Sequence, residues 1–478
     1  MTDILMELGQ NAFIQQAIKT LGLPIPIPQK LRRSDGPWED RPLADRDVAV
    51  FAAPGGALSA VVAQTLAGMG AQPTVFNTAA ESADLAELGE AFARPPVFQS
   101  LQSIPQGFRT DALVFDGTGL EDPAGLRTVY DFFSPLVRGL KPCGRIVLLG
   151  RSPEALKTAE KAAAAQGLEG FTRSVAREVG KRGATANVVY VDAGAEKRVE
   201  AVVRFLLSPR SAYITGQPFH VSKKVQDADT IPWTRVLDKK VALVTGAARG
   251  IGEAIAQSLA AEGAHVVCLD RPADDAPASR VARSVDGSLL LVDITEQEAP
   301  KVIAERLLED FGGVDLVVHN AGITRDKTLQ NMKPELWDQA VDVNLGAVTR
   351  ITERLLDGVM RDGGRLVCLS SVAGIAGNFG QTNYSSAKSG IVGYVRALSA
   401  KVSRRGIAVN AIAPGFIETR LTAAIPAVQR EIGRRMSALG QGGLPRDVAD
   451  LATFLVSPGA QALTGQVIRI CGGMFIGA

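Results

Sequence analysis

The chain has 478 residues, 46% of them hydrophobic, and its 52 Lys and Arg residues nearly balance its 50 Asp and Glu residues, for a formal charge of +2. This length favours two domains, because single hydrophobic cores stop growing beyond roughly 250–300 residues. The near-neutral charge argues against a protein held on nucleic acid or on a membrane surface by bulk electrostatics.

The cysteine pattern bears on the compartment. Cys143, Cys268, Cys368 and Cys471 form no CxxC pair. We expect buried free thiols, as in a reducing, cytoplasmic environment. The chain has no basic leader and no apolar run of 18 residues, so we expect no membrane span. With only 3 histidines, we expect neither a metal site nor a Ser-His-Asp triad.

The first segment, residues 1–46, is expected to be an arm. It begins with a short amphipathic helical pattern and continues with "PIPIP" and a polar stretch. Proline fixes φ and lacks an N–H, so this stretch favours an extended connector.

From residue 47 onward, apolar runs alternate with helical patterns. The strand-like runs are "DVAVFAA", "PTVF", "DALVFD", "GRIVLLG" and "NVVYVD". Such alternation predicts parallel strands joined by crossover helices. We assign residues 47–222 to this first α/β domain.

After a polar linker at residues 223–239 the pattern begins again. Residues 240–478 contain "KVALVTG", "HVVCLD", "LLLVD", "VDLVVHN", "GRLVCLS" and "AVNAIAP". The two halves match at offsets of 193 residues near their starts and 249 near their ends, which indicates a divergent duplication. The sequence therefore predicts two doubly wound parallel-sheet domains. Relative to the second half, the first lacks a segment after the "AVNAIAP" strand, and such an insertion suits a lid over a pocket.

A phosphate-binding loop is predicted at the start of the second half. Gly246, Gly250 and Gly252 lie between an apolar strand and a helix, where they permit a tight turn, close approach of a pyrophosphate and close helix packing. The phosphate would meet free N–H groups at the start of the helix. Asp270 ends the next strand, where a carboxylate can bond the ribose hydroxyls.

The cofactor preference follows from Asp270. A carboxylate there bonds both ribose hydroxyls of NAD and repels the 2′-phosphate of NADP. Arg249 and Arg271 argue the other way, because either could reach a phosphate. We favour NAD(H) over NADP(H).

A candidate catalytic set follows the fifth strand of the second half. Tyr384 and Lys388 are four residues apart, so they share one face of a helix, and Ser371 follows an apolar strand. Reduction of a carbonyl needs a proton donor at the oxygen. We expect Lys388 to lower the pKa of Tyr384 toward neutrality, and Ser371 to hold the carbonyl oxygen.

The first half has lost these side chains. At the matching positions it carries Arg151 for Ser371, Lys161 for Tyr384 and Ala165 for Lys388. Ala53, Ala57 and Ser59 replace the three glycines, and their side chains would crowd a pyrophosphate. We predict that the first domain keeps the fold for packing and binds no dinucleotide tightly.

These motifs resemble the short-chain dehydrogenase/reductase family over residues 240–478. "TGAARGIG" resembles the cofactor loop, "HNAG" the segment after the fourth strand, "YSSAK" the YxxxK motif and "APGFIET" the segment bordering the nicotinamide. The resemblance adds Asn344 to the catalytic residues Ser371, Tyr384 and Lys388, as the holder of a water that links the lysine to solvent. It implies a cofactor site made of Gly246, Arg249, Gly250, Ile251, Gly252, Asp270, Asp293, Ile294, Asn320, Ala321, Gly322, Tyr384, Lys388, Pro414, Gly415, Ile417 and Thr419.

Within the family, the chain is most similar to 3-oxoacyl-(acyl-carrier-protein) reductases of the long type, whose first domain is a degenerate flavodoxin-like copy. The resemblance implies NAD(H)-dependent reduction of 3-oxoacyl thioesters, carried on acyl-carrier protein or CoA, in fatty-acid metabolism. The alternative is a 3-hydroxyacyl-CoA or other secondary-alcohol dehydrogenase working oxidatively. Two departures are His319, where the family has Asn, and Asp270.

The resemblance also bears on partners. Arg405 falls where the family carries a basic residue for the acidic carrier protein, although a solvated helix end explains it equally well. The helices after the fourth and fifth strands pair subunits in the family. We expect the first domain to cover that surface, which predicts a homodimer.

Overall fold

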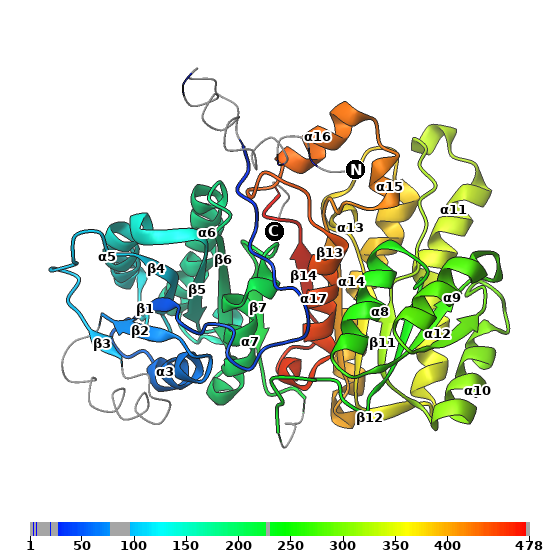
Figure 1. Ribbon diagram of the computed structural model, residues 1–478, viewed down its shortest axis with the longest axis horizontal. Coiled ribbons are helices and arrows are strands. Elements are labelled where there is room, and N and C mark those ends of the chain that lie inside the picture. Colours follow the sequence, from blue (N-terminus) through cyan, green and yellow to red (C-terminus); the bar gives the residue numbers. More distant parts are fainter. Residues whose placement is uncertain are drawn as a thin grey trace.

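The computed structural model describes residues 27–76, 96–225 and 230–474, together with the isolated positions 3, 6 and 20. It contains two α/β units side by side (Figure 1). We call the unit up to residue 222 the N-terminal half and the unit from residue 240 the C-terminal half. The helix expected near the start of the arm lies outside the described residues, and residues 27–46 contain neither helix nor strand.

The N-terminal half is built on a seven-stranded parallel sheet. Its strands are β1 (Asp47–Ala52), β2 (Gln72–Val75), β3 (Val97–Phe98), β4 (Thr110–Asp116), β5 (Leu140–Gly150), β6 (Thr185–Val191) and β7 (Pro218–Val221), and its α-helices are α3 (Ser59–Gly68), α5 (Arg127–Leu136), α6 (Ala159–Gly180) and α7 (Val199–Leu207). β4 and β6 are buried along their whole length, as expected for parallel strands covered by helices on both faces.

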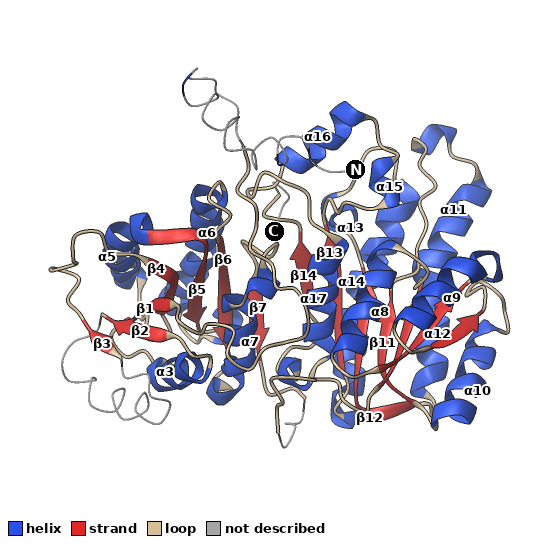
Figure 2. Cartoon of the chain, in the orientation of Figure 1, coloured by secondary structure: helices blue, strands red, loops and turns tan. Residues whose placement is uncertain are grey.

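The C-terminal half repeats this plan with a second seven-stranded sheet. Its strands are β8 (Val241–Thr245), β9 (His265–Asp270), β10 (Ser288–Leu291), β11 (Val314–His319), β12 (Met360–Leu369), β13 (Ala408–Pro414) and β14 (Val467–Ile470). Its α-helices are α8 (Gly250–Ala261), α9 (Asp275–Ser284), α10 (Ala299–Phe311), α11 (Pro334–Val341), α12 (Ala347–Leu356), α13 (Val372–Ala376), α14 (Thr382–Val402), α15 (Arg420–Ala423), α16 (Ala427–Arg435) and α17 (Pro445–Val456). Figure 2 shows the strands of each sheet enclosed by helices.

The strand order is the same in the two halves, as the predicted duplication requires. The sheets read β3-β2-β1-β4-β5-β6-β7 and β10-β9-β8-β11-β12-β13-β14, so the two topologies are identical. Without the two-residue edge strand β3, the first sheet begins 2-1-3-4-5 in sequence order, which is the flavodoxin-like arrangement. The edge strands β3, β7 and β14 were not expected from the sequence.

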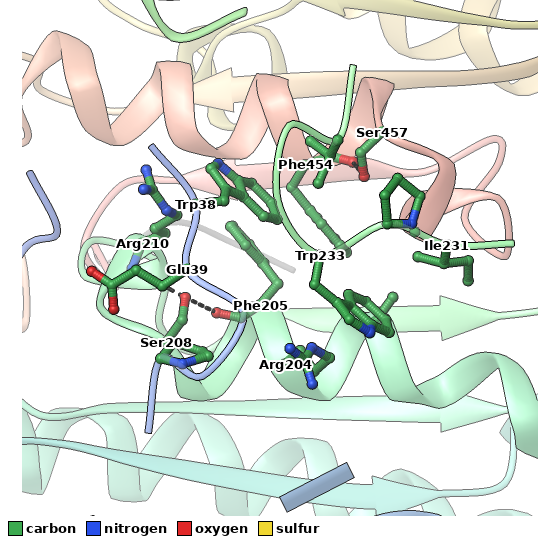
Figure 3. Close-up of a pocket in the computed structure, with 15 residues that line it drawn as sticks. Trp38, Glu39, Arg204, Phe205, Ser208, Arg210, Ile231, Trp233, Phe454 and Ser457 are labelled. Carbon is green, nitrogen blue, oxygen red and sulfur yellow. Dashed lines mark hydrogen bonds between the residues drawn. The ribbon is translucent and has the colours of Figure 1, made fainter. Parts of the chain in front are cut away.

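The two halves meet through matching elements. Phe205 of α7 and Phe454 of α17, which are equivalent at the offset of 249, stack with ring centroids 4.2 Å apart. Trp38 of the arm stacks on both rings, as Figure 3 shows. The side chain of Gln466 bonds the backbone N–H and C=O of His220.

The equivalent contact runs in the opposite direction. Gln217, the counterpart of Gln466, accepts a bond from the backbone N–H of Arg469, the counterpart of His220. Reciprocal contacts of this kind characterise a twofold interface between identical subunits. The duplication has therefore placed an isologous interface inside one chain.

This interface corrects one expectation from the sequence. The N-terminal half covers α17 and β14, not the helices after the fourth and fifth strands. α12 lies on the far side of the second sheet from the N-terminal half (Figure 1). The physical reason is the surface that the two helices bury, since every residue of α17 from Asp447 to Val456 and every residue of α7 apart from Glu200 is buried, and the buried Asp450 pairs with Arg210 of the N-terminal half.

Polar contacts fix the arm on the C-terminal half. Arg33 makes a two-pronged ion pair with Asp447, at 2.7 and 2.9 Å, and the backbone N–H of Trp38 donates to Glu262. The four cysteines are free and buried, as predicted. Among the described residues, no helix combines the length and apolarity that crossing a bilayer requires.

Candidate active site

The glycine loop between β8 and α8 is shaped for close approach. Gly246 and Gly250 have φ of +67° and +62°, a region that side chains disfavour. A Cβ on Gly252 would lie 2.0 Å from the carbonyl oxygen of Gly246 and 2.5 Å from Nδ2 of Asn320. Only glycine lets the start of α8 pack this tightly on the loop, as expected for a dinucleotide cradle.

The "HNAG" segment holds this loop from the neighbouring strand. The Asn320 side chain donates to the carbonyl oxygens of Thr245 and Gly246, both at 3.0 Å. The buried Thr245 hydroxyl accepts from the backbone N–H groups of Asn320 and Ala321. Thr245 was not predicted from the sequence, because a threonine inside an apolar strand carries no motif of its own.

Asp270 lies at the end of β9, beside the loop. Its carboxylate accepts from the backbone N–H of Ala248 at 2.9 Å and of Arg271 at 2.9 Å. These bonds orient the carboxylate next to the phosphate loop, where a ribose would lie.

The two arginines that could favour NADP are engaged by one carboxylate. Arg249 pairs with Asp274, and Arg271 pairs with the same residue at 2.6 Å. The hydrogen bond from Arg271 holds the pKa of Asp274 below its ordinary value. The sequence reasoning missed Asp274, although an acid three residues after "DR" offered the signal.

The remaining predicted cofactor residues follow the same edge of the sheet. Asp293 accepts from the backbone and hydroxyl of Thr295, so it is fixed in a short turn after β10. Ile294 is buried and Ile251 is half-buried. All of these follow the carboxyl ends of parallel strands, where open α/β sheets bind ligands.

Ser371, Tyr384 and Lys388 come together behind this edge. Ser371 caps α13, and its hydroxyl lies near enough to Tyr384, close to the start of α14, to act on the pKa of the phenol. Lys388 lies one turn further, with Nζ 5.7 Å from the centre of the Tyr384 ring. The buried Nζ donates to the carbonyl oxygen of Leu369 at 2.8 Å, which holds the lysine against β12.

Burial governs the protonation of this pair. It raises the pKa of the Tyr384 phenol, and the interaction with Ser371 opposes this only in part. Burial also lowers the pKa of Lys388 to about 8. The expected lowering of the tyrosine pKa toward neutrality is not found, because desolvation of the buried phenol raises it more than the interaction with Ser371 lowers it. The phenol is neutral near pH 7 and so is able to donate a proton.

Asn344 lies in a single π-helical turn, Asp342–Gly346, between α11 and α12. Its Nδ2 donates to the carbonyl oxygens of Ile323 and Ala340 at 2.8 Å. Its Oδ1 is buried and accepts no hydrogen bond from the described residues. A Cβ on Gly322 would lie 2.6 Å from this Oδ1 and 3.4 Å from Nζ of Lys388, so both atoms border one small space. A buried acceptor beside an ammonium group fits the predicted water.

The "APGFIET" segment leaves β13 and opens the expected lid, residues 416–443. Gly415 packs so tightly on Cys471 that a Cβ would lie 2.6 Å from its Cβ. The buried Ile417 forms a bridge with Gly443, so the two ends of the lid meet. Thr419 is held by Thr422, and Pro414 ends β13.

The equivalent edge of the N-terminal half is closed by its own side chains. Asp116 is opposite Ala52 in the strand register of the first sheet, as His319 is opposite Thr245 in the second, so the two residues occupy equivalent positions. Its carboxylate accepts from the backbone N–H of Leu58 at 2.7 Å, at the start of α3. The Thr118 hydroxyl accepts from Ala57 at 2.8 Å. The amide groups that a phosphate would need are thus bonded within the chain.

The replaced catalytic positions have structural partners. Arg151 pairs with Glu196 at 2.8 Å, and Lys161 pairs with Glu121. The carbonyl oxygen of Ala165 accepts from Tyr190.

His319, a departure from the family, and Arg405, the residue considered for the carrier protein, both have partners within the chain. His319 is buried and bonds the Thr352 hydroxyl at 2.9 Å, and burial lowers its pKa to about 4, so it is neutral. The Arg405 guanidinium bonds Asp362 and the carbonyl oxygens of Leu356 and Met360. Arg405 therefore ties down the end of α14.

The fold and this site define a nucleotide-binding oxidoreductase. A family model described as enoyl-(acyl carrier protein) reductase matches residues 246–475. Together with the relatives below, this match shows that the chain belongs to the short-chain dehydrogenase/reductase family, whose members use a nicotinamide cofactor.

The relatives are single-domain enzymes about half as long as this chain. The 3-oxoacyl-(acyl-carrier-protein) reductase FabG of Vibrio cholerae is 40% identical over 241 residues, which are 50% of this chain and 99% of the relative. The enzymes of the same name from Escherichia coli and Pseudomonas aeruginosa are 39% and 41% identical over 98% and 99% of their lengths. The similarity therefore concerns half of this chain.

Proposed function

We propose that the C-terminal half reduces 3-oxoacyl thioesters to 3-hydroxyacyl thioesters with NADH. The observation that carries this proposal is the grouping of Ser371, Tyr384 and Lys388 beside a glycine cradle that leaves no room for side chains. Identity of about 40% to 3-oxoacyl-(acyl-carrier-protein) reductases supports the substrate class.

The reaction assigns a separate task to each side chain. The bound nicotinamide supplies a hydride. The neutral Tyr384 phenol gives its proton to the carbonyl oxygen, while Ser371 donates a hydrogen bond to the same oxygen. Lys388 and the buried Oδ1 of Asn344 restore the proton through water. In the direction of reduction the neutral phenol, with its pKa above the ordinary value, is the form that donates the proton.

A preference for NADH follows from the charges around Asp270. Its oriented carboxylate suits the two ribose hydroxyls and repels a 2′-phosphate. Asp274 occupies Arg249 and Arg271, the two cations that could otherwise compensate this repulsion.

The apolar side chains of the lid support the proposal that the substrate carries an acyl chain. Val428, Ile432 and Met436 are spaced four residues apart along α16 and are 74%, 57% and 42% exposed. Phe379, in the loop just before α14, is 89% exposed. Apolar side chains left in solvent on an active-site lid suit an apolar substrate chain. The carrier is acyl-carrier protein or CoA, and the hydrogen bonds of Arg405 within the chain give this residue a structural role that needs no carrier.

The proposed function also divides the chain into domains and bears on its assembly. On this proposal, residues 1–46 are the arm, residues 47–222 the degenerate copy, residues 223–239 the linker and residues 240–478 the catalytic domain. The internal interface uses α17 and β14, which leaves the faces of α12 and α14 to pair with a second chain. We therefore propose a homodimer.

The test is steady-state kinetics with NADH and NADPH on acetoacetyl-CoA, longer 3-oxoacyl thioesters, an enoyl thioester and simple ketones. The proposal predicts the highest kcat/KM with NADH and a 3-oxoacyl thioester. Oxidation of 3-hydroxyacyl-CoA or of a simple alcohol at a higher kcat/KM would support the oxidative alternative instead. Turnover of the enoyl thioester alone would overturn both.

A further inference from the structure

A tyrosine from the N-terminal half reaches into the lid of the other half. Tyr213 follows α7, in the turn before β7, and is 1% exposed. Its hydroxyl donates to the carbonyl oxygen of Gln441 at 2.9 Å, and Ser437 donates to the same oxygen. Its counterpart at the offset of 249 is Ala462, so the shared fold does not require a tyrosine at this position.

The ring of Tyr213 lies against two glycines of the C-terminal half. A Cβ on Gly443 would lie 2.6 Å from the ring, and one on Gly472 would lie 2.7 Å from it. The backbone N–H of Gly472 also donates to the carbonyl oxygen of Tyr213 at 3.2 Å. The absence of side chains at these two positions gives the ring its space.

Both glycines connect directly to the segment that leaves β13. Gly443 exchanges backbone hydrogen bonds with Phe416 and Glu418, at 3.0 and 2.8 Å. Gly415 bonds Ile470 on β14, two residues before Gly472. Gly443 alone therefore separates the Tyr213 ring from residues 416–418, and residues 470–472 connect the ring to Gly415.

Other groups of the N-terminal half and the arm contact the same part of the lid. Ala438 packs on Gly180 at the end of α6, where a Cβ would lie 2.3 Å from its carbonyl oxygen. The Gln441 side chain donates to the carbonyl oxygen of Gln29. The lid base, residues 437–443, is thus held by residues that single-domain relatives lack.

We propose that Tyr213 is a positioning residue, which sets residues 414–419 against the nicotinamide from a domain that has no chemistry of its own. This inference rests on the proposed function for the identity of the cofactor site. It gives the degenerate half a task in catalysis, because the border of the cofactor site is built against it.

The test compares Tyr213 with a matched tyrosine. Tyr190 is also 1% exposed, and its hydroxyl bonds Ala165 within the N-terminal half. In the full chain, Tyr213→Ala is expected to raise the Kd of NADH, measured by fluorescence titration, and its KM about tenfold, with a smaller effect on kcat. Tyr213→Phe keeps the ring and should stay within about threefold of wild type. Tyr190→Ala should lower the melting temperature without changing the Kd of NADH.

A double-mutant cycle separates positioning from loss of stability. Gly443→Ala alone crowds both the ring and Cδ1 of Ile417, whereas in the Tyr213→Ala background the clash with the ring is removed and only the end of the Ile417 side chain has to shift. We expect the double variant to bind NADH more tightly than the two single effects predict. Additive effects, or equal changes in Kd for Tyr213→Ala and Tyr190→Ala, would overturn the proposal. Absence of thioester turnover in the wild type would refute the proposed function alone, because NADH binding is measured without substrate.

Discussion

At the scale of residues, the buried Lys388 predicts a pH dependence. Burial lowers its pKa to about 8, so the side chain is charged below this pH and neutral above it. The charge stabilises the phenolate that Tyr384 becomes after it donates its proton. We expect kcat for reduction to be constant at lower pH and to fall as the pH rises through about 8.

The control for this prediction is Lys388→Arg, which keeps a positive charge at all accessible pH values. Its activity is expected to be lower, with the fall displaced to higher pH. A wild-type profile that stays flat to pH 10 contradicts the role assigned to the lysine charge.

The sequence predicted the candidate site residues through their motifs, but not their environment. The spacing of Tyr384 and Lys388 fixed one shared helix face. The opposite shift of the tyrosine pKa depends on burial, which no local pattern reports. Asp274 and Thr245 escaped prediction for a related reason, because their roles come from contacts made by distant residues.

At the scale of elements, the close packing at the start of α8 predicts that one added methyl group weakens NADH binding. Gly252→Ala places a Cβ 2.0 Å from the carbonyl oxygen of Gly246, and overpacking of this kind costs about 1–3 kcal/mol. We expect NADH binding, followed by titration, to weaken by about 10- to 100-fold.

The matched control lies on a helix of the N-terminal half. Gly170 is on α6, and nothing lies within 4 Å of a Cβ placed there. Gly170→Ala should bind NADH as the wild type does and gain about 0.5–1 kcal/mol in stability. Equal affinities for the two variants would show that the loop does not hold the cofactor as proposed.

Elements were predictable where they carry long apolar runs. The inner strands, such as β4 and β11, are buried throughout and lie where the sequence indicated. The edge strands β3, β7 and β14 have only two to four residues, too few to establish a period. Their pairing is decided by the neighbouring strand.

At the scale of the whole molecule, the internal interface predicts the assembly. On the proposed function, the N-terminal half takes the place of one partner on the catalytic half, and a second chain pairs with the faces of α12 and α14. Light scattering coupled to size-exclusion chromatography should give about 100 kDa, twice the 50.3 kDa chain. A species of about 200 kDa contradicts the proposed homodimer.

The duplication was readable from the sequence, but the surface that joins the halves was not. Offsets between matching segments identify equivalent residues without saying which of them touch. The reciprocal bonds of Gln217 and Gln466 became visible only in the folded chain. An arm residue, Trp38, completes this surface, and no repeat marks it in the sequence.

The central claim is that one phenol, present only in the C-terminal half, delivers the proton. The most direct measurement is the kcat of Tyr384→Phe in the full chain with NADH and the best 3-oxoacyl thioester. The account predicts a loss of about 10²- to 10⁴-fold in kcat, with the melting temperature unchanged. Turnover within twofold of the wild type would contradict it.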